Sequence, residues 1–176
     1  MNIHIRGEHY GNDMAVLTQS GRTAIAQSVK NQVIHLAWGT SQSDNGFDNF
    51  DALPEDPTQT ALIREVGRRV VDEVLFCVGD DQGDLITPTG RFRYSDDPTN
   101  NLYIKTVFDF PDASEYTIRE LGLFVGTVTN PDLPVGQRYF LPADIVDSGI
   151  LLLLENSVPL IRTAATRESF EFVITF

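Results

Sequence analysis

The segment TIRELGLFVGT, residues 117–127, indicates the fold class because it reads as a strand that enters a hydrophobic core. Side chains of a strand alternate between its two faces. The two faces consist of alternate residues, namely Ile118, Glu120, Gly122 and Phe124 on one side and Arg119, Leu121, Leu123 and Val125 on the other. Each face has a charge near its start and continues with apolar residues, which is typical of a strand that runs inward from a charged rim.

Further strands, separated by turns, are expected on both sides of this segment. They cover residues 33–40, 70–79, 91–95, 101–110, 149–156 and 167–176. The last of them, RESFEFVITF, alternates most clearly, since Phe170, Phe172, Ile174 and Phe176 all face one way. We expect this strand to close the domain's own sheet, with Phe176 at or near the core.

Two helices are expected before most of the strands. Residues 18–31 have Ser20 as a candidate N-cap and place Ile25 and Val29 on one face. Residues 58–69 read as a second short helix because apolar residues recur four apart. The sequence therefore predicts an α+β fold, a predominantly antiparallel β-sheet or sandwich with two short N-terminal helices.

The domain organisation follows from where this periodicity begins. Residues 1–16 show no sustained periodicity and are expected to form an extended arm that orders against a neighbouring subunit. Residues 17–176 are expected to form a single α+β domain, in which residues 40–57, rich in Ser, Asp, Asn, Gly and Pro, make a long surface loop.

The net charge is strongly negative, at −12 from 25 acidic and 13 basic residues. Such a charge repels phosphate, so neither nucleic acid nor an anionic membrane surface is expected as a partner. It suits a basic protein partner, although a merely soluble acidic surface is the simpler interpretation. The N-terminus lacks a signal-peptide core, so synthesis in the cytoplasm without export is expected.

Residues that could support catalysis or metal binding do not form a recognisable motif. Cys77 and His35 lie within expected strands and are interpreted as core residues, His35 with satisfied ring nitrogens. The run GDDQGD, residues 79–84, has part of the spacing of a calcium loop but is expected to be a solvated turn. Asp109 and Asp112 have no spacing specific to a glycosidase. No catalytic, cofactor or metal site, and hence no enzyme, is expected.

Four segments, in order, resemble a family of phage proteins. They are LTQSGRTAIAQSV, HLAWGT, DPTQTALIREVGRR and TIRELGLFVG, which lie within residues 17–126. Together they are similar to the tail-collar-fibre-like domain of contractile-tailed bacteriophages, found at tail-fibre N-termini and in small baseplate proteins. The resemblance implies an α+β attachment domain in the virion. Its implied partners are other baseplate or tail-fibre proteins, and several copies are expected in a symmetric assembly.

The resemblance favours a compact baseplate component or fibre adaptor over a whole fibre. A fibre continues into a trimeric shaft, whereas this chain reaches Phe176 within an expected strand. The alternative function is a carbohydrate-binding β module for host recognition, in which Trp38, Tyr94 or Tyr103 would stack on a sugar.

The adjacent charges at the start of residues 117–127 are the candidate functional residues. Arg119 is expected to meet a nearby carboxylate, and Glu120 to meet Arg64, Arg68 or Arg69 of the second expected helix. A charge at the edge of a core is costly unless it is paired or hydrogen-bonded. A structural ion-pair network is the first interpretation, and an exposed docking pair for a neighbouring subunit is the second.

Overall fold

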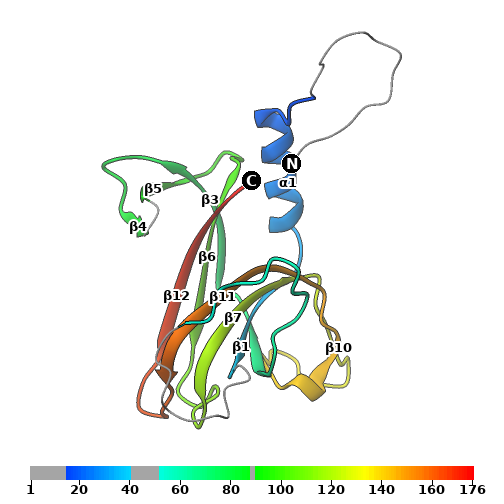
Figure 1. Ribbon diagram of the computed structural model, residues 1–176. Coiled ribbons are helices and arrows are strands. Elements are labelled where there is room, and N and C mark those ends of the chain that lie inside the picture. The colour runs from blue at the N-terminus through cyan, green and yellow to red at the C-terminus, as the bar shows by residue number, and fades with distance from the viewer. Residues whose placement is uncertain (1–14, 41–51, 88–89) are drawn as a thin grey trace.

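The computed structural model describes residues 15–40, 52–87 and 90–176, and these form a β-sandwich flanked by one helix (Figure 1). Every strand pair within this part of the chain is antiparallel. The first sheet has the strand order β11 (Ile150–Ile161), β7 (Thr117–Val125), β1 (Ile34–Gly39), β2 (Glu65–Val70) and β9 (Tyr139–Phe140). The second has the order β12 (Glu168–Thr175), β6 (Asn101–Phe108), β3 (Glu73–Gly79), β5 (Gly90–Ser95) and β4 (Leu85–Thr87).

Smaller elements lie between β7 and β11 along the chain. A two-stranded ribbon joins β8 (Val128–Thr129) to β10 (Ile145–Asp147), and the short 3-10 helix η1 (Pro142–Asp144) precedes β10. The predicted α+β class with a mainly antiparallel sheet is thus confirmed. No helix in the described ranges is long and apolar enough to cross a membrane.

Helix α1 (Gln19–Lys30) confirms the first expected helix, but its N-cap is Thr18 and not Ser20. The Thr18 hydroxyl accepts a hydrogen bond from the Gly21 amide at 3.1 Å, which satisfies one of the free donors of the first turn. Ala26 and Val29 are buried and belong to the main core cluster. The helix lies beside one end of the long strands of the second sheet (Figure 1).

The second expected helix is wrong. The chain before Glu65 is irregular in the described residues, and β2 then forms a strand between β1 and β9. Arg68 is the partner of Ala37 on β1 and of Phe140 on β9 in the strand register. Local spacing suited a helix, but ladders to two neighbouring strands satisfy the backbone of this segment, and such non-local pairing overrides a weak local preference.

The hydrophobic core lies between the sheets and centres on Trp38 of β1. Its indole is fully buried and stacks on Phe108 of β6 at 3.7 Å between ring centroids. Phe170 of β12 meets the Trp38 ring edge-on at 5.6 Å. Phe170, Phe172 and Ile174 pack on the main core cluster, so the apolar face predicted for the last strand does point into the core.

Strand β7 departs from the expected faces at one residue. Leu121, Leu123 and Val125 point into the main core, as expected for one face. Ile118 was placed on the opposite face but packs in the same core, next to an irregularity in the pairing of β11 with β7. The extra residues of this irregularity lie on β11, between Asn156 and Leu160, and such a departure cannot be read from the spacing of β7 alone.

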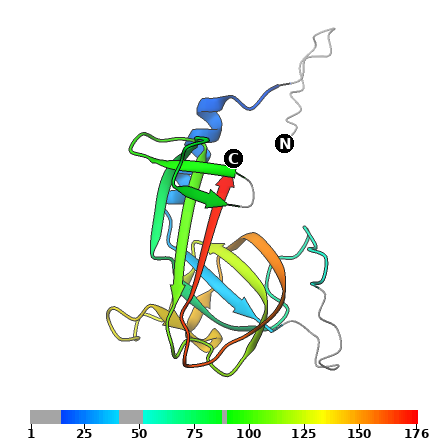
Figure 2. The ribbon, with the colours of Figure 1, turned by 90° about the vertical axis from the view of Figure 1, so that its left-hand side faces the viewer.

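The second sheet extends beyond the first, and the views in Figures 1 and 2 agree on this arrangement. The first sheet faces only one part of the long strands, while α1 lies beside the other part. Strands β11 and β12 each form one edge of their sheet, and β9 and β4 form the opposite edges. Residues 1–14 of the expected arm and residues 41–51 of the expected long loop lie outside the described residues.

Candidate docking site

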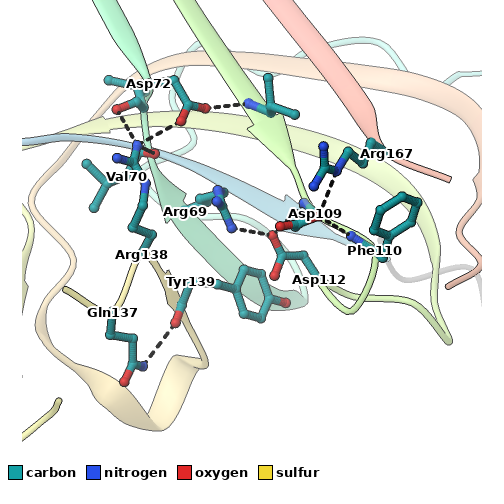
Figure 3. Close-up of polar contacts among 12 residues, drawn as sticks. Arg69, Val70, Asp72, Asp109, Phe110, Asp112, Gln137, Arg138, Tyr139 and Arg167 are labelled. Atoms are coloured by element: carbon teal, nitrogen blue, oxygen red, sulfur yellow. Dashed lines mark hydrogen bonds and ion pairs between the residues drawn. The ribbon is translucent and has the colours of Figure 1, made fainter. Parts of the chain in front are cut away.

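The loop between β6 and β7 is held by arginines from three separate segments, and Figure 3 shows two of them, Arg69 and Arg167. Arg69 of β2 pairs with the Asp112 carboxylate at 2.7 Å, and Arg167, just before β12, pairs with Asp109 at 2.8 Å. The pKa of Asp109 is lowered, first by the hydrogen bond from the Phe110 amide and then by Arg167. The carboxylates considered as a catalytic pair therefore serve as anchors for arginines.

The third arginine, Arg162, follows β11 and is 2% exposed. Its guanidinium donates to the Asp109 carbonyl at 2.9 Å and to the Asp112 carbonyl at 3.2 Å. It also donates to the Thr166 carbonyl at 3.0 Å and lies 5.1 Å above the Trp38 ring. Arg162 therefore connects the loop, the β11–β12 connection and the core, and the sequence analysis missed it because no local motif marks it.

Arg68 forms a second buried network on the other side of β2. Its fork binds both oxygens of Glu65 at 2.7 Å each, and its remaining nitrogen donates to the Thr127 hydroxyl and the Ser148 carbonyl. The guanidinium also lies 4.2 Å from the centre of the Phe124 ring. The bidentate pair lies within β2 and orients the guanidinium, whose hydrogen bonds to Thr127 and Ser148 then fix β2 against the ends of the β8–β10 ribbon.

His35 of β1 lies near this network and is 1% exposed. Its pKa is lowered from 6.5 to about 4, first by burial and then by the charge of Arg68. Within the described residues neither ring nitrogen has a hydrogen-bond partner. The expectation of a satisfied core histidine is wrong in that respect, although the burial itself was expected.

The candidate pair Arg119 and Glu120 lies on β7, next to the segment that precedes β2. Glu120 is fully buried, and its Oε2 accepts a hydrogen bond from the Ile63 amide at 2.8 Å. This contact fastens the segment before β2 to β7. Gly39 permits the close approach, since a Cβ built there would lie 3.2 Å from the Glu120 carboxylate.

The other candidate residues do not gather around one carboxylate. Arg68 binds Glu65, and Arg69 binds Asp112. Arg64, just before β2, is exposed, and Arg119 on β7 is half-buried. The pairing of Glu120 with an arginine remains a prediction.

The aromatic residues proposed to stack on a sugar are mostly inaccessible. Trp38 is fully buried and Tyr103 is 2% exposed, while Tyr94 is 48% exposed and meets Tyr103 edge-on. A carbohydrate platform needs an exposed ring face, so only Tyr94 of the three offers one. The alternative interpretation as a carbohydrate-binding module loses its main residues, because these rings pack in the interior.

The remaining candidate groups also have structural surroundings. Cys77 is buried, and burial raises its pKa to about 11, which disfavours the reactive thiolate. Asp80 accepts a hydrogen bond from the Gln82 amide and pairs with Arg93, as in an ordinary turn. No group of three or more His, Cys, Asp or Glu side chains that could hold a metal ion occurs among the described residues.

A groove with mixed apolar and acidic walls lies at the open side of the sandwich, between the edge strands. It is lined by Leu153 and Glu155 of β11, by Ser169, Phe170, Glu171, Phe172 and Val173 of β12, and by Thr87 of β4. In the strand register Glu155 is opposite Leu121, a core residue of β7. Its pKa is raised, first by burial and then by the nearby Glu55. The groove therefore has the acidic side chains of Glu155 and Glu171 at its border and the apolar side chains of Leu153, Phe170 and Phe172 in its lining.

Comparison with known proteins identifies the family. The phage protein family described as "Baseplate wedge 3 tail fiber network component" matches residues 14–176. The chain belongs to this family. A related protein, "Virion protein 3" of Enterococcus phage phiEF24C, is 25% identical over 177 residues, which cover 92% of this chain and 95% of that protein.

The family assignment confirms the resemblance seen in the sequence to baseplate and tail-fibre proteins of phages. This member of the baseplate wedge 3 family is thus a structural protein of the phage tail baseplate. Its ion-pair networks connect strands within the chain, and the groove between β11 and β12 presents apolar side chains at an open sheet edge.

Proposed function

We propose that this chain is a building block of the tail baseplate that also serves as an adaptor for attaching tail fibres. The observation that carries this proposal is the family match over residues 14–176, whose description names both a baseplate wedge and a tail fibre network. The arrangement of the molecule agrees with it, because buried arginines brace a small sandwich. A rigid body of this kind transmits force between the neighbours that it connects.

The adaptor acts without catalysis, as part of an assembly that contains several copies of the chain. It is made in the host cytoplasm and incorporated into the virion tail. Its partners are other baseplate or tail-fibre proteins. Symmetric repetition is the usual arrangement of such assemblies. Its residues 17–176 act as one folded domain, preceded by an arm formed by residues 1–16.

A nonsense mutation in the gene for this chain, grown with and without a suppressor host, tests the proposal. Particles made without the chain should contain tail tubes and sheaths but lack attached fibres, as seen by electron microscopy and by mass spectrometry of purified virions. Complementation with the wild-type chain should restore the fibres. Normal fibres on particles that contain none of the chain would refute the adaptor role.

A further inference from the structure

Strand β12 has an open edge suited to pairing with another strand. It pairs with β6 over eight consecutive residues without a register shift, and no strand in the described residues pairs with its other side. Free edges are usually protected by bulges, prolines, lysines or short length. β12 contains neither proline nor lysine, and its sequence ESFEFVIT is rich in residues that favour strands.

The corresponding edge of β11 is partly covered by the chain itself. The Asn156 amide donates to the Glu55 carboxylate, and the Asn156 side chain donates to the Pro54 carbonyl, both at 3.3 Å. The pairing of β11 with β7 is also irregular at two places. Of the two strands that border the groove, β12 is therefore the one whose free edge can form regular backbone hydrogen bonds with an added strand.

The side chains on both sides of β12 define what an added strand would meet. On the side facing the groove floor, Phe170 and Phe172 lie beside Leu153 and are only partly buried. Glu155 borders the same side, and Glu171 borders the other, where it pairs with Lys105 at 3.4 Å. The two side chains of that ion pair are 32% and 43% accessible, so the pair is partly solvated, contributes little and can be replaced by a competing cation.

We infer that the free edge of β12 binds an extended segment of another virion protein, in which apolar side chains alternate with lysine or arginine. Backbone hydrogen bonds to β12 provide the affinity, and the side chains that line the groove determine which sequences bind. The apolar side chains cover Phe170, Phe172 and Leu153 on one side of β12, while the basic ones on the other side meet Glu171. This inference rests on the proposed adaptor function, whose partners it describes chemically.

Charge argues for a different protein and against a second copy of this chain. The chain carries a net charge of −12, so two copies repel one another at long range, whereas a basic segment is attracted. Pairing of β12 with its own copy would also bring acidic side chains of the same strand together, and like charges opposite each other destabilise a ladder.

A binding measurement with designed peptides tests the inference on the full chain. The probe is a labelled octapeptide of alternating valine and arginine, and its counterpart carries glutamate in place of arginine. Fluorescence anisotropy at physiological salt should show binding of the arginine peptide alone. Hydrogen exchange should slow at the amides of Glu168–Thr175 when this peptide is bound.

Charge variants separate the groove from the general acidity of the protein. Glu171→Gln should weaken binding of the arginine peptide about threefold, as expected for the loss of one modest charge pair. Asp132→Asn removes the same charge from an exposed residue outside the groove and should leave binding nearly unchanged. Glu171→Lys should reduce the preference for the arginine peptide further and strengthen binding of the glutamate peptide.

Several outcomes would overturn the inference. Equal losses in the two neutralised variants would mean diffuse attraction, and protection away from β12 would mean a different site. A dimer in sedimentation experiments with β12 already protected would identify a second copy as the occupant. Slow exchange of β12 in the isolated full chain that becomes fast on deletion of residues 1–14 would identify the chain's own N-terminus. None of these results depends on whether fibres are lost from mutant particles.

Discussion

Replacing Arg162 with alanine should destabilise the protein strongly, although the residue belongs to no recognisable motif. The side chain is 2% exposed and donates hydrogen bonds to the carbonyls of Asp109, Asp112 and Thr166. Truncation leaves these acceptors without their donor and opens space beside Trp38, which the guanidinium contacts. Removing one partner of a buried charged network typically costs about 3–5 kcal/mol.

Arg162 also pairs with the Glu168 carboxylate at 3.4 Å, and that side chain is 29% accessible. Because water can solvate Glu168 after the truncation, the expected loss lies near the lower end of the range, at about 3 kcal/mol. Small domains have a total stability of about 5–15 kcal/mol, so the variant should fold but unfold at a clearly lower urea concentration. Urea unfolding followed by tryptophan fluorescence measures the change. Arg162→Lys should recover only part of the loss, because an ammonium group lacks the planar fork.

Arg167→Ala is the matched control, since it removes an arginine that also binds Asp109. Its ion pair is exposed, with side chains 58% and 40% accessible, and such pairs contribute at most about 1 kcal/mol. Similar losses for the two variants would refute the reasoning, because they would show that burial of the guanidinium does not determine its contribution.

Three further predictions concern other parts of the chain. Because the pKa of His35 is about 4 in the fold against 6.5 for an ordinary histidine, the unfolded state binds more protons between these two pH values. Stability should therefore fall as the pH drops from about 6.5 to 4, by about 3 kcal/mol in denaturant titrations. Glu120→Ala should cost roughly 1–3 kcal/mol in thermal melts, because the Ile63 amide loses its acceptor. Deleting residues 168–176 should abolish folding, as monitored by circular dichroism, because Phe170 contacts both Trp38 and Phe108 in the core.

Each of these predictions has a result that would contradict it. His35→Leu should lack the acid-dependent component, and an unchanged pH profile in this variant would assign that component to other groups. A Glu120→Ala protein with unaltered melting but failed assembly would support a docking role for the residue. Fast hydrogen exchange throughout β12 in an otherwise protected protein would show that this strand is dispensable for the fold.

The sequence by itself determined the elements whose pattern is local. Helix α1 could be read from a four-residue apolar spacing, and β6, β7 and β12 from alternation. Burial of Trp38 and Cys77 followed from their place in apolar runs. The phage family was also recognisable from four short segments, since the family match covers residues 14–176.

Only the tertiary structure decided the features that depend on strand neighbours. Residues 65–70 became β2 because β1 and β9 pair with both of its sides, which no local spacing reveals. The register set by these ladders also separates the arginines, so that Arg68 meets Glu65 whereas Arg69 meets the distant Asp112. Strand order, in turn, left β11 and β12 at sheet edges and created the groove between them. Alternation indicates which face of a strand is apolar, but only pairing between distant segments determines which edge remains open.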